Sequence, residues 1–206
     1  MIRQAYVVDD DAPVRASLQG LLSAATSALV RGFPSGDAFL AEMSELEPGV
    51  VILDVNMPGT SGLDVLTTIR DAGRLDQLVP IVVTGQGNIA MAVEAMRAGA
   101  LDFLEKPYDR ASLLHFVEEG FRQIEEADAA SRRGQAAQDK LSRLSARETD
   151  VLTGLIAGRP NKVIAYDLGI SPRTVEIYRA NLMDKLEVRS LSEALRIAFA
   201  AGLITE

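Results

Sequence analysis

Short apolar runs alternate with helix-like segments along the first 126 residues. Five runs rich in Val, Ile and Leu predict strands at residues 5–8, 27–33, 50–53, 79–83 and 100–104. Five segments with apolar residues at helical spacing predict helices at residues 13–24, 36–45, 62–72, 89–98 and 111–126. Because most of these strands are too apolar to have a solvent-facing side, the alternation predicts an α/β fold with a doubly wound, five-stranded parallel sheet. The ligand site of such a sheet lies at the carboxyl ends of its strands.

The pattern changes after residue 126. Residues 127–140 are polar, rich in alanine and of mixed charge, which is typical of a helical or semi-flexible linker. No strand pattern follows residue 141. Two capping-box motifs open helices in that part of the chain, Ser145 with Glu148 and Ser190 with Glu193. We therefore predict an α/β domain at residues 1–125, a helical linker at 126–141 and an all-α domain at 142–206.

The composition excludes several classes of protein. The 206 residues include no cysteine, which excludes disulfide frameworks, thiolate zinc sites and cysteine nucleophiles and suits a reducing compartment. The N-terminal segment reaches Asp9 too early for a signal peptide, and no run approaches the ~18 apolar residues of a membrane span. We therefore expect a cytoplasmic protein with no membrane partner.

The net charge of −8 is unevenly distributed along the chain. Residues 1–120 carry 8 basic and 17 acidic side chains, whereas residues 140–190 carry 9 basic and 6 acidic ones. The negative net charge of the whole chain argues against a nucleic-acid partner, but the excess of basic residues in 140–190 is compatible with one. The asymmetry indicates two units with different partners.

Polar residues stand at the carboxyl ends of four predicted strands. They are Asp9, Asp10 and Asp11 after the first, Asp54 at the end of the third, Thr84 at the end of the fourth and Lys106 with Pro107 after the fifth. Any one of them alone is more often a cap, a turn residue or a solvated side chain. Together they meet at one edge of the sheet, where clustered carboxylates require a cation and suit Mg²⁺. The Lys and Thr complete a site for a phosphoryl group.

Four motifs resemble the receiver domain of bacterial two-component response regulators over roughly residues 1–125, which implies a flavodoxin-like fold. They are Val-Val-Asp9-Asp10-Asp11, Leu-Asp54-Val-Asn56-Met-Pro58-Gly59, Val-Thr84-Gly and Phe103-Leu-Glu-Lys106-Pro107. The resemblance implies that Asp54 accepts a phosphoryl group from a histidine kinase and that Lys106 pairs with the acyl phosphate. It also implies a magnesium site formed by Asp9, Asp10, Asp54 and the backbone carbonyl of Asn56. Asp11 lies outside that motif and is expected to cap the following helix.

The resemblance further implies a switch, in which Thr84 moves toward the phosphoryl group and Phe103 turns inward behind it. Phe103 as a simple core aromatic is the alternative. A phosphatase of the haloacid-dehalogenase kind is disfavoured, because that family needs a second Asp where this chain has Asn56. Asn56 and Gln86 are expected to flank the water that slowly hydrolyses the phosphoryl group. No turnover enzyme is therefore expected, only self-phosphorylation and slow autodephosphorylation.

Residues 161–175 have the spacing of a helix-turn-helix. Ala165 is small where two helices would cross, Gly169 falls in the turn, and Ser171 with Pro172 opens the second helix, residues 172–186. The first turns of that helix would enter the major groove, and lysines nearby would contact phosphates. The expected DNA contacts are Lys162, Arg173, Thr174, Glu176, Ile177, Arg179, Ala180, Asn181 and Lys185. Such helix pairs also occur without DNA.

The runs Leu-Ser145-Ala-Arg-Glu148 and Ile-Ser-Pro-Arg173-Thr-Val-Glu176-Ile-Tyr-Arg179-Ala-Asn181 resemble the LuxR-type, four-helix DNA-binding domain over about residues 142–206. With a receiver, this indicates the NarL/FixJ class of response regulators, and the second run is nearest to its FixJ branch. Glu176 stands where many LuxR-type domains carry Lys, and a carboxylate can accept a hydrogen bond from a cytosine amino group. The alternative is that Glu176 is an exposed surface residue with no role in reading DNA.

The resemblance implies a phosphorylation-activated transcription factor that binds promoter DNA and contacts RNA polymerase. Its receiver would form a homodimer through the fourth helix and fifth strand, from Ile89 to Glu105. Leu195 and Phe199 on the last helix could pair the DNA-binding domains, or they could belong to the core. The alternative function is a receiver-controlled switch that binds a protein or RNA instead of specific DNA.

Overall fold

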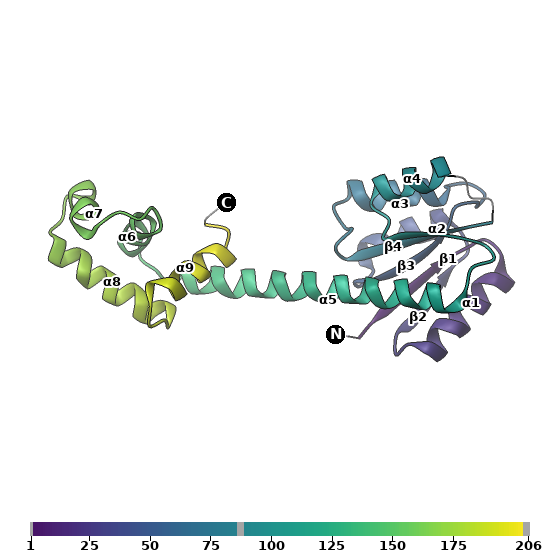
Figure 1. The fold of residues 1–206 in the computed structure, drawn as a ribbon, viewed down its shortest axis with the longest axis horizontal. Coiled ribbons are helices and arrows are strands. Elements are labelled where there is room, and N and C mark those ends of the chain that lie inside the picture. The colour runs from purple at the N-terminus through teal and green to yellow at the C-terminus, as the bar shows by residue number, and fades with distance from the viewer. Residues whose placement is uncertain (1, 86–88, 204–206) are drawn as a thin grey trace. The chain divides into compact units, whose positions relative to one another are not determined.

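The computed structural model describes residues 2–85 and 89–203. The chain divides into two compact units, residues 1–127 and 128–206, and the boundary falls within helix α5 (Arg110–Leu141). Figure 1 shows a sheet with flanking helices in the first unit and helices alone in the second. Within the described ranges, no helix is long and apolar enough to cross a membrane.

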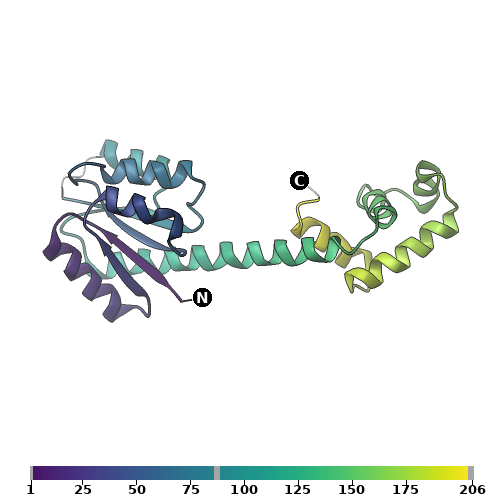
Figure 2. The ribbon, with the colours of Figure 1, turned by 180° about the vertical axis from the view of Figure 1, so that it is seen from behind.

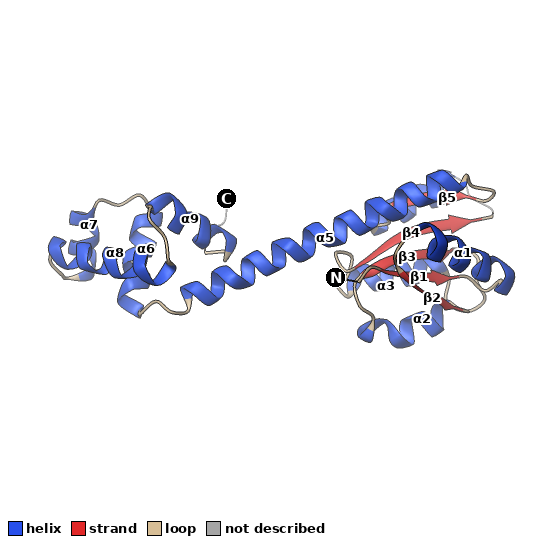
Figure 3. Cartoon of the chain, turned by 90° about the horizontal axis from the view of Figure 1, so that it is seen from below, coloured by secondary structure: helices blue, strands red, loops and turns tan. Residues whose placement is uncertain are grey.

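The first unit contains one parallel sheet in the order β2-β1-β3-β4-β5 (Figure 3). The strands are β1 (Gln4–Val8), β2 (Leu29–Phe33), β3 (Gly49–Asp54), β4 (Leu78–Thr84) and β5 (Asp102–Glu105). The predicted five-stranded, doubly wound fold is therefore confirmed. Strand order reverses direction between β1 and β3, and a crevice at the carboxyl ends there is where such sheets bind ligands.

Helices cover both faces of the sheet, as Figure 1 shows for α3 and α4 on one side and α1 on the other. The helices are α1 (Ala12–Ala25), α2 (Gly36–Glu42), α3 (Gly62–Asp71), α4 (Ile89–Ala98) and α5, with a short 3-10 helix, η1 (Met43–Glu45), after α2. One core cluster joins the sheet to α2, α3 and α4, and the second joins its other face to α1 and α5. β3 and β4 are buried throughout, whereas the edge strand β2 exposes Leu29.

The strands predicted at residues 27–33 and 100–104 each begin two residues later, at Leu29 and Asp102, and two predicted helices end elsewhere. The helix expected at residues 36–45 ends at Glu42 and continues as η1. Helix α5 runs without interruption to Leu141, so the segment expected to be a helical or semi-flexible linker is helical. Its Ala, Gln and Arg residues favour helix, and the ion pair of Arg132 with Asp128 one turn earlier (2.9 Å) supports it. The domain limits at residues 125 and 141 stay a prediction.

Up to residue 203, the second unit contains the end of α5 and four further helices (green to yellow in Figure 2). They are α6 (Ala146–Ile156), α7 (Asn161–Leu168), α8 (Pro172–Leu186) and α9 (Leu191–Ala200). Ser145 forms a complete capping box with Glu148, and Ser171 caps α8 ahead of Pro172. Gly169 ends α7 at a φ of 65°, a conformation that glycine adopts without steric cost. The predicted all-α, helix-turn-helix architecture is therefore confirmed.

Candidate functional site

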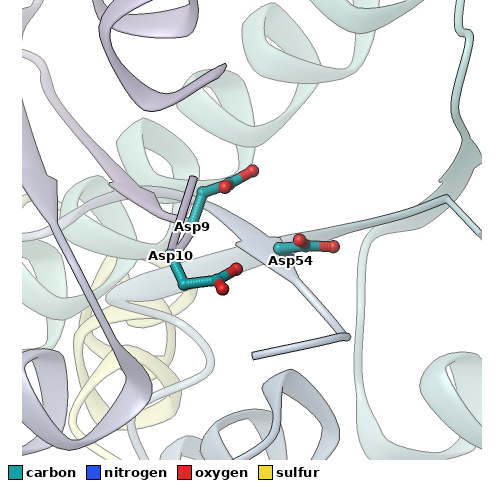
Figure 4. A group of neighbouring side chains, drawn as sticks. All are labelled: Asp9, Asp10 and Asp54. Carbon is teal, nitrogen blue, oxygen red and sulfur yellow. The ribbon is translucent and has the colours of Figure 1, made fainter. Parts of the chain in front are cut away.

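Three carboxylates meet at the carboxyl ends of β1 and β3. Asp9 and Asp10 follow β1, Asp54 ends β3, and one oxygen of each lies within 4.8 Å of the others. Figure 4 shows the three side chains gathered at these strand ends. Asp9 is 2% and Asp54 8% exposed, whereas Asp10 faces solvent. The structure therefore brings together the acidic residues that the sequence placed at strand ends.

A single lysine faces two of these carboxylates. Lys106 Nζ lies 3.0 Å from Asp9 Oδ2 and 3.4 Å from Asp54 Oδ2. Burial raises the pKa of the Asp54 carboxyl, the Lys106 charge acts against that shift, and the Asp9 charge adds to it. Burial by itself disfavours the Lys106 ammonium, but its bonds to Asp9 and Asp54 raise the pKa of Lys106. The cluster thus joins three carboxyl groups to one lysine.

Asp54 has an unsatisfied oxygen in this cluster. Its Oδ1 is buried and has no hydrogen-bond partner among the described residues. Such an atom costs free energy unless a ligand supplies the missing interaction. Three carboxylates with one unpaired oxygen are the donor set that fits a hard divalent cation such as Mg²⁺. Glycine at position 62 lets the start of α3 pack closely against the end of β3, because a Cβ there would lie 2.2 Å from the Asp54 carbonyl oxygen.

The sequence reasoning missed Arg15. Its Nη1 donates a hydrogen bond to the Asp9 carbonyl oxygen (2.6 Å), and Asp11 N donates to Asp9 Oδ1 (2.9 Å). Asp11 also caps α1 through Val14 N, as predicted. Arg15 thus fixes the turn from which Asp9 and Asp10 project. An arginine in the first turn of the helix after an Asp run is the signal that could have identified it.

Of the predicted switch residues, Thr84 ends β4 and Phe103 lies on β5. Thr84 is fully buried, and Asn56 Nδ2 donates a hydrogen bond to Thr84 Oγ1 (3.0 Å). Phe103 is partly buried and packs against the core cluster that contains α3 and α4. Gln86 lies outside the described residues. Asn56 therefore contacts the predicted switch threonine directly, a connection that the sequence did not indicate.

Helix α8 of the second unit presents one exposed face. Five of the expected DNA contacts lie on it, at the i, i+3, i+4, i+7 spacing of a helical stripe: Arg173, Glu176, Ile177, Ala180 and Asn181. The opposite face carries the buried Val175, Leu182 and Leu186. The exposed stripe is therefore the surface of α8 that is available to a partner.

Two other expected DNA contacts have hydrogen-bond partners inside the unit, and a third is exposed. Thr174 Oγ1 lies 2.8 Å from the capping Ser171 Oγ, and Arg179 Nη1 donates to Asn161 Oδ1 (2.9 Å). Lys162 is exposed at the start of α7.

Lys185 has a partner that the sequence did not reveal. Its Nζ donates to Glu148 Oε2 (2.6 Å), and Glu148 is 3% exposed. The bond to Lys185, together with the one from Ser145 N, lowers the pKa of the Glu148 carboxyl. A buried carboxylate needs a counter-charge, and Lys185 supplies it while its side chain stays 41% exposed, so its contact with a DNA phosphate stays a prediction.

Comparison with known proteins defines the class. Residues 5–118 match the response regulator receiver domain, and residues 142–198 match the luxR family of bacterial regulatory proteins. The chain is 43% identical to the transcriptional regulatory protein FixJ of Rhizobium meliloti (strain 1021) over 198 residues, 96% of this chain and 95% of that protein. It is 44% identical to FixJ of Azorhizobium caulinodans over 199 residues, 96% and 92% of the two chains.

Solved structures agree. The low-resolution structure of the response regulator StyR matches with a TM-score of 0.82 and 35% identity over 97% of this chain and 99% of that one. Full-length FixJ from B. japonicum matches with a TM-score of 0.58 and 42% identity over 98% of both chains. The fold and the matches define a phosphorylation-activated transcriptional regulator of a two-component system. The chain belongs to the response regulators that join a receiver to a LuxR-type DNA-binding domain.

Proposed function

We propose that Asp54 is the residue that accepts the phosphoryl group from the histidine kinase implied by the receiver domain. The observation that carries this is the buried Oδ1 of Asp54, which has no hydrogen-bond partner among the described residues, while Oδ2 faces Lys106. A carboxylate oxygen attacks the phosphorus of a phosphohistidine, the P–N bond breaks, and the imidazole leaves with that electron pair. Lys106 stabilises the charge on the transferred oxygens.

Asp9, Asp10, Asp54 and the Asn56 backbone carbonyl would hold Mg²⁺. When bound, the ion neutralises the carboxylates and the phosphoryl oxygens. Lys106 already pairs with Asp9 and leaves Asp10 without an ion pair among the described side chains. The excess of carboxylates over lysine supports a divalent cation in this position.

Thr84 and Phe103 form the proposed switch. The Thr84 hydroxyl would turn from the Asn56 amide toward the phosphoryl group, and Phe103 would follow into the space behind it. Ile89, Val93 and Met96 on α4 are 85%, 43% and 49% exposed and follow one another at helical spacing. This apolar stripe supports homodimerisation of the phosphorylated receiver through α4 and β5. Equal self-association of both forms in sedimentation would exclude the mechanism.

We expect no catalytic turnover beyond self-phosphorylation from a phosphodonor and slow autodephosphorylation. Asn56 and Gln86 are proposed to flank the hydrolytic water. The variants Asn56→Ala and Gln86→Ala should change the lifetime of the phosphoryl group more than the rate of phosphorylation. Unchanged decay in both variants would contradict this role.

The exposed stripe of α8 is proposed to read DNA in the major groove. Glu176 would accept a hydrogen bond from a cytosine amino group, Arg173 would orient it, and Lys162 would contact a phosphate. Leu195 and Phe199 are absent from the core cluster of this unit, and Phe199 is 51% exposed, which supports pairing of two DNA-binding domains through α9. RNA polymerase is the expected further partner.

A mobility-shift assay tests the proposal. Wild-type protein with acetyl phosphate and Mg²⁺ should bind duplexes enriched from a random pool at lower concentration than protein without them. Asp54→Ala should remove that difference. Asp11→Asn, which keeps an N-cap residue beside the cluster, is the matched control and should retain the difference. Phosphorylation-dependent binding by Asp54→Ala would overturn the assignment of Asp54.

A further inference from the structure

The end of α8 has an unusual backbone conformation. Glu187, the residue after the helix, has a φ of 59°, and among the described residues it is the one non-glycine with a positive φ. Its N–H bonds to Asp184 O and the N–H of Val188 bonds to Met183 O, both at 3.0 Å, which closes the helix. A residue other than glycine adopts this left-handed backbone conformation where contacts with neighbouring groups stabilise it.

The last turn of α5 and the turn that follows it supply those contacts. Lys140 Nζ donates to the Leu186 carbonyl oxygen (3.1 Å) and pairs with Glu187 Oε2 (3.0 Å). Arg143 Nη1 lies 3.4 Å from Glu187 Oε1. The bond from Lys140 is the main reason why the pKa of the Glu187 carboxyl lies below its ordinary range. An ammonium at this point also complements the negative end of the helix dipole.

We propose that Lys140 is a positioning residue for DNA binding: it caps the C-terminus of α8 through Leu186 O and Glu187 and so fixes the direction in which the exposed stripe of α8 faces DNA. The ion pair of Lys185 with Glu148 holds the same last turn from the side of α6. Contacts from both α5 and α6 therefore end at one turn of α8. This inference rests on the proposed role of α8 as the reading helix.

Substitutions at Lys140 and at Glu187 test the contact between these two residues. Lys140→Met should weaken binding of the phosphorylated full-length protein to its enriched duplex by about tenfold, and Lys140→Arg should stay within about twofold of wild type. Glu187→Gln removes a negative charge, so electrostatics alone predicts tighter binding to DNA. Positioning by Lys140 predicts weaker binding instead, and this opposite sign decides between the two.

Matched controls lie on the same helix. Arg132→Met removes one positive charge from α5 but breaks only the pair with Asp128, and it should stay within about twofold of wild type. Asp139→Asn removes a negative charge next to Lys140 and should leave binding unchanged or tighter. Hydrogen exchange should accelerate in Lys140→Met at residues 183–188 and remain unchanged in α6 and α7.

Several results would overturn the proposal. They are tighter binding by Glu187→Gln, equal losses in Lys140→Met and Arg132→Met, no rescue by Lys140→Arg, or faster exchange throughout residues 142–203. If wild type binds no duplex from the pool, the proposed function fails and the positioning role fails with it. If wild type binds and all variants bind alike, only the positioning role fails.

Discussion

Each unit of this chain contains a lysine bound to a buried carboxylate, and the two sites differ in how completely that charge is satisfied. In the DNA-binding unit, Lys185 and the Ser145 N–H bond to Glu148, and the pKa of Glu148 is lowered. In the receiver, Lys106 faces Asp9 and Asp54 together.

In the receiver, the Asp54 carboxylate is therefore only partly satisfied. Within the part of the chain that the structure describes, one Asp54 oxygen has no hydrogen-bond partner, and burial is the main cause that raises the pKa of Asp54. Removing one partner of a satisfied buried charge pair destabilises a fold, whereas an unsatisfied buried charge is typical of a place where a ligand binds or chemistry occurs. The comparison predicts opposite responses of the two sites to the same kinds of perturbation.

The largest effect is expected from Mg²⁺. At a concentration of 100 times its Kd, the ion should raise the free energy of unfolding of the receiver by about 2.7 kcal/mol, because it binds the native carboxylate cluster. Urea unfolding followed by hydrogen exchange in peptides of each unit measures this in the full chain. Peptides of the DNA-binding unit serve as the internal control. Equal stabilisation of both units, or of neither, would contradict the site.

Glu148→Gln should destabilise the DNA-binding unit by about 2 kcal/mol. The amide keeps the capping box but leaves the Lys185 ammonium without its counter-charge, and Lys185 is exposed enough to recover part of its hydration. The same exchange experiment on peptides of α6 and α8 gives the value. Glu176→Gln, on the exposed stripe, is the control, and a matching loss there would argue against a special role of Glu148.

Asp54→Asn should stabilise the receiver by about 1 kcal/mol in Mg²⁺-free buffer, because it removes an unsatisfied charge from the cluster. Functional sites often cost stability in this way. Thermal unfolding of wild type and variant without Mg²⁺ provides the measurement. A loss of receiver stability would show that the Asp54 carboxylate is satisfied in the fold.

Lowering the pH should change the stability of the two units in opposite directions at Glu148 and Asp54. The folded pKa of Glu148 lies below its unfolded value near 4.5, so its contribution is present above that pH and is lost as the pH falls through the folded value. The folded pKa of Asp54 lies above 3.8, so its destabilising charge disappears as the pH falls through the folded value. The measurement is the free energy of unfolding of each unit as a function of pH, in Mg²⁺-free buffer. Glu148→Gln should remove the slope of this curve in the DNA-binding unit, and Asp54→Asn should remove it in the receiver. Persistence of either slope in its variant would assign it to another group.

The smallest effect on stability is expected at the exposed stripe of α8. Glu176→Ala should change the free energy of unfolding by less than about 0.5 kcal/mol, since Glu176 is exposed. Its effect should appear in base preference, with discrimination at one position falling by about 1–3 kcal/mol. Binding to a duplex library with each position varied tests this. An unchanged preference would refute the reading role of Glu176.

The sequence predicted the elements that local patterns control. β3 and β4 are recognisable as apolar runs, α8 has the expected bounds because Ser171 and Pro172 open it and its apolar residues recur at helical spacing, and Asp11 caps α1. The acidic cluster was also predictable, because parallel strands align their carboxyl ends and thereby bring Asp9 and Asp54 together. Such signals are contained within a few neighbouring residues or follow from the topology of the sheet.

Contacts between distant segments were decided only by the tertiary structure. The sequence could not show that Asn56 bonds to Thr84 or that Glu148 binds Lys185. A lysine or an arginine has the same local pattern whether it faces solvent, DNA or a buried carboxylate. Its partner depends on which helices pack together, and that packing results from the burial of the whole core rather than from the residues next to it in the chain.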